Sequence, residues 1–257
     1  MKAMRFVVVV ALLLLPTASA FAQARGARGG PPGSPKTVAP VDLTGYWEAV
    51  VVEDWRYRML PPIKFQEQAR LGERNSIPMN AEARKAALTW DPQRDETAGE
   101  TCRAYGAPNI MRIPGRIRIT WRDDVTLKLE TEAGTQTRLF EFGTPKATGA
   151  DWQGVSTASW DLLPGGGRGG PLLSGSLKVV TSRLRAGYLQ KNGIPYSSNA
   201  VVTEYFARVA EGNGDSYLVI TAIVEDPTYL TEPYLTSTHF KRLTGGSAWK
   251  PSPCVVR

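Results

Sequence analysis

The sequence predicts a mainly β protein, folded as an antiparallel barrel or a strongly curved sheet with one short helix. Segments rich in β-branched and aromatic residues dominate from Tyr46 onward, and Gly, Pro, Asn or Asp residues bound them. Tight breaks separate these segments, and one of them has a face that mixes charged and aromatic residues. Such a face is typical of strands that curl around an interior, so a barrel fits better than a flat sandwich.

The expected strands follow one another at short spacing, which favours an antiparallel meander. They are residues 45–52, 116–121, 125–131, 135–142, 154–161, 176–182, 200–208, 217–225 and 235–242. The breaks at Asp123-Asp124, at Ala133-Gly134 and at residues 212–214 contain the residue types that hairpin turns require.

One helix is expected to interrupt the strands. Asn80 can cap the run 81–89, which is rich in helix-forming residues, and Asp91-Pro92 is expected to end it. The apolar residues of this run are mostly alanines, so we expect the helix outside a sheet or across one end of the barrel. Residues 61–78 are interpreted as a long surface excursion, and residues 163–175 as a mobile glycine-rich loop.

Alternation along two strands indicates how their faces differ. In residues 116–121, Ile117, Ile119 and Trp121 share one face, while the two arginines and Thr120 share the other. In residues 200–208, Glu204 shares a face with Val202, Phe206 and Arg208. That mixed face is unusual for a solvent-facing side, and it favours strands that enclose a cavity.

The N-terminus has the three-part pattern of a secretory signal peptide, which we assign to residues 1–22. Lys2 and Arg5 precede the apolar run 6–15, and small residues follow, with possible cleavage after Ala20, Ala22 or Ala24. The run is about ten residues long, whereas a bilayer span needs roughly 20, so we expect export to the periplasm or beyond without a membrane anchor. Residues 23–40 are interpreted as a disordered Gly/Pro-rich leader, and residues 41–257 as a single barrel-like domain.

The charge of the chain argues against nucleic-acid binding. The formal net charge is +7, but five of the positive residues (Lys2, Arg5, Arg25, Arg28 and Lys36) precede the expected domain, which leaves about +2 on its body. No Lys/Arg-rich helix or basic aromatic platform is present in the sequence.

Cys102 and Cys254 are the only cysteines. In an oxidising compartment an isolated pair of this kind usually forms one bond, so we expect a disulfide that fastens the C-terminal tail to the body. A zinc site would need more ligands than two cysteines and the single histidine usually supply, and we expect neither a metal nor a cofactor.

The expected domain opens with Asp42-Leu43-Thr44-Gly45-Tyr46-Trp47. Its Gly-x-Trp motif resembles the opening of lipocalin-type barrels, in which a tryptophan plugs the closed end and an arginine from the last strand stacks over it. The resemblance implies that Trp47 is this plug and that Arg242, at the end of the last expected strand, is its partner.

A second resemblance covers most of residues 90–242. It rests on Trp90-Asp91-Pro92, on residues 102–114, 152–160 and 175–181, on Asn192-Gly193-Ile194-Pro195-Tyr196-Ser197, on Glu204-Tyr205-Phe206 and on residues 226–233. In this order the segments resemble an uncharacterised family of secreted bacterial proteins. The resemblance implies no reaction. The sequence departs from that family at Trp160-Asp161, where the long glycine loop replaces the usual Trp-Glu-Gly-Asp turn.

Several familiar catalytic arrangements do not fit the sequence. His239 is the only histidine, which excludes paired acid–base histidines, and the sequence contains no Gly-x-Ser-x-Gly elbow. The glycine run 165–170 lacks the Lys-Ser/Thr that phosphate binding requires. The weak acid–base candidates are Glu204, Asp226 and His239. The competing interpretation is a hydrogen-bonded structural residue for His239, and a solvated or arginine-paired carboxylate for Glu204 and Asp226.

Charged and aromatic residues on the expected strands, or directly after them, are the candidates for ligand contact. They are Asp54, Trp55, Arg118, Trp121 and Tyr205. Burying a lone charge costs several kcal/mol, so such residues pair with one another, face a hydrated cavity or lie on the outer surface. Because Glu204 and Tyr205 are neighbours on one strand, they point to opposite faces and cannot line the same cavity.

These observations favour a secreted or periplasmic binding protein for a small, partly hydrophobic ligand. The alternative is a cavity-based lyase, isomerase or hydrolase that uses the acid–base candidates. A third possibility is an assembly module whose aromatic patches meet another protein.

Overall fold

A computed structural model describes residues 33–59, 63–71, 76–146, 151–163 and 174–256. These residues belong to one compact unit that begins at Gly33. Its main strands are β1 (Gly45–Val50), β2 (Arg116–Trp121), β3 (Thr126–Thr131), β4 (Thr137–Phe142), β5 (Val155–Leu163), β6 (Ser174–Ser182), β9 (Val201–Ala210), β10 (Ser216–Glu225) and β11 (Tyr234–Leu243). A small hairpin joins β7 (Gly187–Tyr188) to β8 (Pro195–Tyr196).

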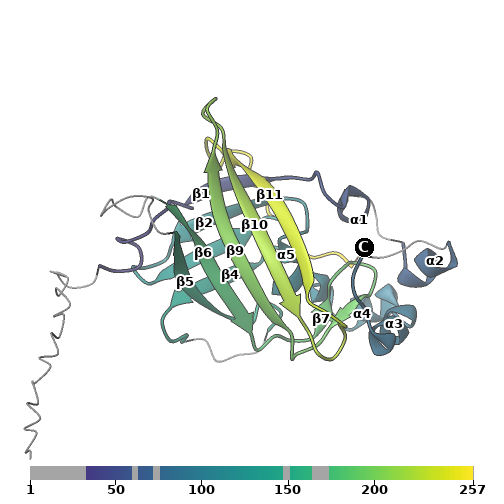
Figure 1. Ribbon diagram of the computed structural model, residues 1–257. Coiled ribbons are helices and arrows are strands. Elements are labelled where there is room, and N and C mark those ends of the chain that lie inside the picture. The colour runs from purple at the N-terminus through teal and green to yellow at the C-terminus, as the bar shows by residue number, and fades with distance from the viewer. Residues whose placement is uncertain (1–32, 60–62, 72–75, 147–150, 164–173, 257) are drawn as a thin grey trace, which may run out of the picture. The chain divides into compact units, whose positions relative to one another are not determined.

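The nine main strands close into a barrel in the order β1-β11-β10-β9-β6-β5-β4-β3-β2. Closure occurs because β1 pairs with β11 on one side and with β2 on the other. Figure 1 shows the long strands β9, β10 and β11 side by side across the barrel wall. The predicted fold class is therefore confirmed, although lipocalin barrels have eight strands and this barrel has nine.

Each of the nine expected strands is present, with ends that move by a few residues. The expectation of a purely antiparallel meander is wrong at one seam, where β4 and β5 are parallel. The connection 143–154 between them is long enough to carry the chain back along the barrel, so β5 starts at the same end as β4. The β7–β8 hairpin is inserted between β6 and β9 and lies outside the barrel order.

The expected single helix is present as α3 (Ala81–Leu88), and Asn80 Oδ1 caps it by accepting from the Ala83 N–H at 3.0 Å. The other helical segments were not predicted: α1 (Trp55–Met59), α2 (Phe65–Arg70), α4 (Pro92–Thr97), η1 (Arg103–Tyr105) and α5 (Ala107–Ile110). The sequence predicts that the helix ends at Asp91-Pro92. In the structure α3 ends at Leu88, and Asp91-Pro92 begins the next helix, α4. Asp91 caps the Gln93 N–H and Pro92 occupies the first turn, where the missing N–H costs nothing.

The inward-facing side chains of the barrel pack into one apolar cluster. Trp47, Phe140, Phe206 and Phe240 are buried at its centre. Tyr105, Ile110 and Met111, from η1 and the region of α5, belong to the same cluster, so this helical segment fills one end of the barrel. The interior is therefore occupied by the protein's own side chains where these residues meet, and the clefts described below lie outside it.

A second apolar cluster joins the short helices to that end of the barrel. It contains Ala83 and Ala87 of α3, Leu189, Ile194 and Tyr196 of the hairpin region, and Val202 and Val224 of the barrel wall. Figure 1 shows α2, α3, α4 and β7 gathered on the same side of the molecule. We call this assembly of short helices and hairpin the cap. No helix among the described residues is long and apolar enough to cross a membrane.

Trp47 lies fully buried at the other end of the barrel. Its Nε1–H donates to the Leu43 carbonyl at 3.0 Å, and the Arg242 guanidinium carbon lies 5.6 Å from its ring centroid. The pair faces the barrel interior because Trp47 and Arg242 are direct partners in the β1–β11 register. This is the arrangement that the Gly-x-Trp opening implies.

The described part of the expected disordered leader, residues 33–40, is placed against the barrel. Trp160 Nε1–H donates to the Pro35 carbonyl at 2.8 Å, and the Lys36 N–H donates to the Asp124 carbonyl at 3.2 Å. The composition of the segment predicts disorder. These hydrogen bonds offset part of the conformational entropy that the segment loses when it is ordered. The signal peptide and most of the loop 163–175 lie outside the described residues.

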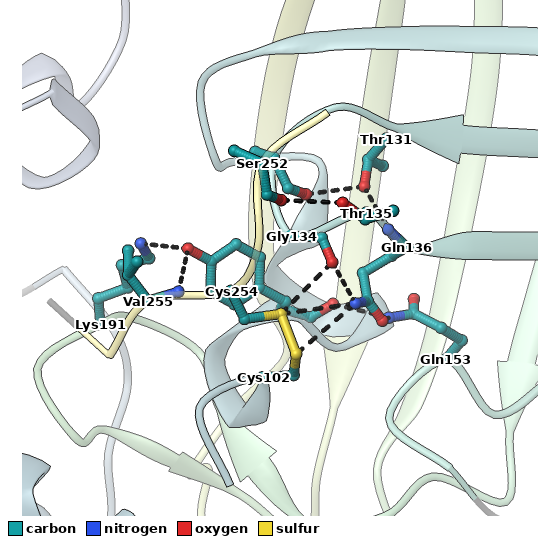
Figure 2. Close-up of a disulfide and its surroundings, with 12 residues drawn as sticks. Cys102, Thr131, Gly134, Thr135, Gln136, Gln153, Lys191, Ser252, Cys254 and Val255 are labelled. Atoms are coloured by element: carbon teal, nitrogen blue, oxygen red, sulfur yellow. Dashed lines mark hydrogen bonds between the residues drawn. A yellow bond between two sulfur atoms is a disulfide. The ribbon is translucent and has the colours of Figure 1, made fainter. Parts of the chain in front are cut away.

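The predicted disulfide is confirmed between Cys102 and Cys254. Figure 2 shows the tail beside it, where the Thr135 hydroxyl donates to the Ser252 carbonyl at 2.9 Å. The Val255 N–H donates to the Tyr105 hydroxyl at 3.1 Å. The tail therefore has one covalent and several hydrogen-bonded attachments to the body.

Candidate ligand-binding site

A cleft of about 190 Å³ lies in the cap, where α3, α4, η1 and the β7–β8 hairpin meet the turn 226–230. Its walls are formed by Ala86, Thr89, Trp90, Asp91, Arg94, Asp95, Arg103, Tyr188, Gly193, Pro195 and Tyr229. The lining thus combines three aromatic rings with two arginines and two carboxylates. Concave sites with an apolar wall and a few placed polar groups are where small ligands bind.

The carboxylate of Asp95 organises the floor of this cleft. It is almost fully buried, and it accepts from Trp90 Nε1 at 2.8 Å, from Arg103 Nη1 at 3.0 Å and from the Tyr188 hydroxyl at 2.9 Å. These donors come from three different parts of the chain. One carboxylate therefore holds two ring side chains and a guanidinium in fixed positions, as pre-organised binding requires.

The cation in this network is shared between several groups. Arg103 also pairs with Glu100 at 3.0 Å, and its guanidinium carbon lies 4.6 Å from the centroid of the Tyr188 ring. Burial is the main factor that raises the pKa of the Tyr188 phenol, and the nearby Asp95 adds to it while Arg103 opposes it. Tyr188 therefore stays protonated at neutral pH and serves as a hydrogen-bond donor.

The Trp90 ring takes its position because Gly193 leaves space for it. Gly193 has a φ of +88°, and a Cβ atom there would lie 2.3 Å from the Trp90 Cβ. Trp90 and Tyr188 then meet edge to face with centroids 6.0 Å apart. A glycine at position 193 is thus required for the close approach of the hairpin to Trp90.

The charged groups at the mouth of the cleft differ in their pairing. Asp91 accepts the Gln93 N–H as the N-cap of α4. Arg94 is exposed, and its side chain has no hydrogen bond or ion pair within the part of the chain that the structure describes. Arg94 is therefore available to a ligand.

A smaller hollow adjoins the cleft on the side of the C-terminal tail. Its lining includes Lys191 and Val256 as well as Trp90, Asp95 and Tyr188. Lys191 Nζ donates to the Tyr105 hydroxyl at 2.6 Å, the same oxygen that accepts the Val255 N–H. The disulfide-linked tail thus forms part of the wall behind the site.

The structure places the three acid–base candidates in separate surroundings. Glu204 faces the barrel interior and forms an ion pair with Arg138. Asp226 accepts from the Ser197 N–H at 2.6 Å and from the Ser197 hydroxyl at 2.7 Å, which fixes the turn after β10. His239 lies on the outer face of β11, with Nδ1 3.4 Å from Glu53 Oε2. They do not converge, so this arrangement gives no support to the enzymatic alternative.

The candidates Asp54 and Trp55, which follow the first expected strand, lie at the start of α1. Asp54 accepts from Arg112 Nη2 at 2.8 Å, and Trp55 is exposed. Glu53 binds the buried guanidinium of Arg58 and contacts His239 as well. Asp54 and His239 therefore share one charged neighbourhood beside β11, but the carboxylates and guanidiniums there already pair with one another.

The remaining ligand candidates lie on different surfaces. Arg118 is on the outer face of β2 and donates to Glu130, a hydrogen bond that raises the pKa of Arg118 and lowers that of Glu130. Tyr205 is on the outer face of β9, where Lys178 Nζ lies 5.7 Å from its ring centroid. Trp121 packs against Phe142 at the far end of the barrel.

The residues that line the cleft were not among the predicted site residues. Trp90, Asp95, Arg103 and Tyr188 lie in short helices, a loop and a two-residue strand, where periodicity carries little signal. A signal was present in the second resemblance, because four of its segments supply Trp90, Arg103, Gly193 and Tyr229.

Comparison with known families gives no further assignment: no protein-family model matches the chain, and no curated protein matches it. Within the described residues, no group of three or more His, Cys, Asp or Glu side chains is arranged to hold a metal ion. The site must therefore be interpreted from its own geometry.

Proposed function

We propose that this protein is an exported binding protein that holds a small, partly apolar molecule in the cap cleft. The observation that carries the proposal is the Asp95 carboxylate, which fixes Trp90, Arg103 and Tyr188 around one cleft with a volume of about 190 Å³. Side chains held in place before binding lose little conformational freedom when the ligand enters, so affinity is gained without new contacts.

Export is part of this proposal. The N-terminal sequence has the pattern of a secretory signal, and the Cys102–Cys254 bond is of the kind that persists in oxidising compartments. Membership of the uncharacterised secreted family belongs to the proposal too, since several segments on which that resemblance rests supply the cleft lining.

A thermal-shift screen of the oxidised protein against lipids, terpenoids and aromatic acids tests the proposal. A ligand at 100 times its Kd stabilises the folded state by about 2.7 kcal/mol. Ala86→Phe, which places a ring in the cleft, should abolish the shift, whereas Ala81→Phe on the exposed side of the same helix should retain it. A panel without hits, or a hit that survives Ala86→Phe, would contradict binding in this cleft.

A further inference from the structure

We infer that the ligand of the cap cleft is a small aromatic acid, whose ring lies among Trp90, Tyr188 and Tyr229 and whose carboxylate pairs with Arg94. This inference rests on the proposed function and specifies the chemical class of the ligand. It follows from the size of the cleft, from the faces that line it and from the pairing of its charges.

The size and the walls of the cleft favour a single ring. Its volume of about 190 Å³ is below the roughly 300 to 1,000 Å³ of sites for drug-sized ligands, so it encloses a single ring more fully than a long acyl chain or a terpenoid. Trp90 and Tyr188 meet edge to face at 6.0 Å, and Tyr229 belongs to the same lining. Aromatic faces arranged in this way favour a further ring in stacked or edge contact.

The pairing of the charges favours an anion. Asp95 receives hydrogen bonds from three donors, which leaves its carboxylate satisfied. Arg103 is shared between Asp95 and Glu100. Asp91 caps α4, while Arg94 has no side-chain partner among the described residues. A ligand carboxylate at the mouth therefore gains a charge-assisted hydrogen bond to a fork-shaped donor that no described residue already engages.

Three compounds of nearly the same shape test this inference: benzoate, which is an anion, benzamide, which is neutral, and benzamidine, which is a cation. Each is titrated into the oxidised full-length mature protein by calorimetry, and the ¹H–¹⁵N signal of the Trp90 indole, identified with Trp90→Phe, reports occupancy of the cleft. Benzoate should bind most tightly. Its affinity should fall as salt is added, because the Arg94 guanidinium is exposed.

A matched pair of variants isolates the cation. Arg94→Gln should weaken benzoate binding by about five- to tenfold and leave benzamide unchanged, since a hydrogen bond to a charged group is lost at a solvated position. Arg84→Gln, on the exposed surface of α3 and outside the cleft lining, should change neither.

The outcomes separate the inference from the proposed function. If benzamide or benzamidine binds as tightly as benzoate, or if Arg94→Gln leaves benzoate binding unchanged, the inference is overturned while binding in the cleft stands. The inference is also overturned, and binding in the cleft stands, if benzoate does not bind but another compound of the screening panel does and Ala86→Phe abolishes its binding. If no compound perturbs the Trp90 indole, both the inference and the proposed function fail.

Discussion

Arg138 and Glu204 meet inside the barrel although their strands, β4 and β9, are not neighbours. Arg138 Nη1 donates to Glu204 Oε1 at 2.9 Å and Arg138 Nη2 to Oε2 at 2.5 Å, and both side chains are buried. Thr181 on β6 accepts from Arg138 Nη2 at 3.1 Å, and it also bonds to Ser156 on β5 at 2.8 Å. A polar chain therefore links four consecutive barrel strands across the parallel β4–β5 seam.

Glu204→Gln should destabilise the protein by about 3 to 5 kcal/mol, because it leaves a buried guanidinium without a counter-charge. Glu130→Gln is the matched control. It breaks the partly exposed Arg118–Glu130 pair, which is worth about 1 kcal/mol or less. Urea denaturation at neutral pH measures both free energies of unfolding. Equal small losses in the two variants would show that the interior pair is hydrated or easily replaced.

The mixed face around Glu204 illustrates how far the sequence can go. Alternation correctly predicts that Val202, Glu204 and Phe206 share a face, and that the face is unlike a solvent side. It does not reveal that Glu204 meets Arg138, because that contact depends on barrel closure and on a parallel seam. The interior charge was thus interpreted as a sign of a ligand cavity, whereas the structure uses it in an internal ion pair.

The strands were predictable for a physical reason that does not apply to the cap. Period-two alternation over six to ten residues defines a strand locally, so β2 and β10 are visible in the sequence. The elements α1, α4 and β7 have two to six residues, too few for a helical or strand period to stand out. Tertiary packing decides their conformation, so the cleft that they build could not be predicted from pattern.

Reduction of the Cys102–Cys254 bond should lower stability more than any single surface change. The bond joins residues 152 positions apart, and the chain-entropy model gives about 5 kcal/mol for a loop of that length. Cys102→Ser should therefore melt at a lower temperature than the wild-type protein under oxidising conditions, and at the same temperature when both are reduced. An equal difference under both conditions would mean that packing at Cys102, not the bond, is responsible.

Trp47→Ala should destabilise the protein by about 3 to 5 kcal/mol, because the ring is fully buried and its Nε1–H bonds to Leu43. Arg242 would also lose the ring over which it lies. Trp55→Ala provides the control, since 58% of Trp55 is exposed, and its loss should change stability by about 0.5 kcal/mol or less. A near-zero effect at Trp47 would remove it from the barrel core.

Tyr188 and Tyr196 offer a matched test of the cap, because both are largely buried phenols that differ in their hydrogen bonding to the described residues. The Tyr188 hydroxyl donates to Asp95, whereas the Tyr196 hydroxyl is buried with no hydrogen-bond partner among the described residues. Tyr188→Phe should cost about 1 to 3 kcal/mol at pH 7, since it removes a donor from a buried carboxylate. Tyr196→Phe should be neutral or stabilising.

At alkaline pH, the stability of the Tyr188→Phe and Tyr196→Phe variants should depend on pH less steeply than that of the wild-type protein. Burial raises the pKa of both phenols above the ordinary value of about 10, so above that pH the unfolded chain loses protons that the folded protein retains. Folding stability then falls as pH rises, and each Phe variant should show a shallower fall because it lacks one such group. Urea denaturation at pH 7 and at pH values above 10 measures the slopes.

If Tyr196→Phe proves as destabilising at pH 7 as Tyr188→Phe, the hydroxyl of Tyr196 has a partner such as a bound water. If its alkaline slope also matches wild type, burial does not hold that phenol protonated.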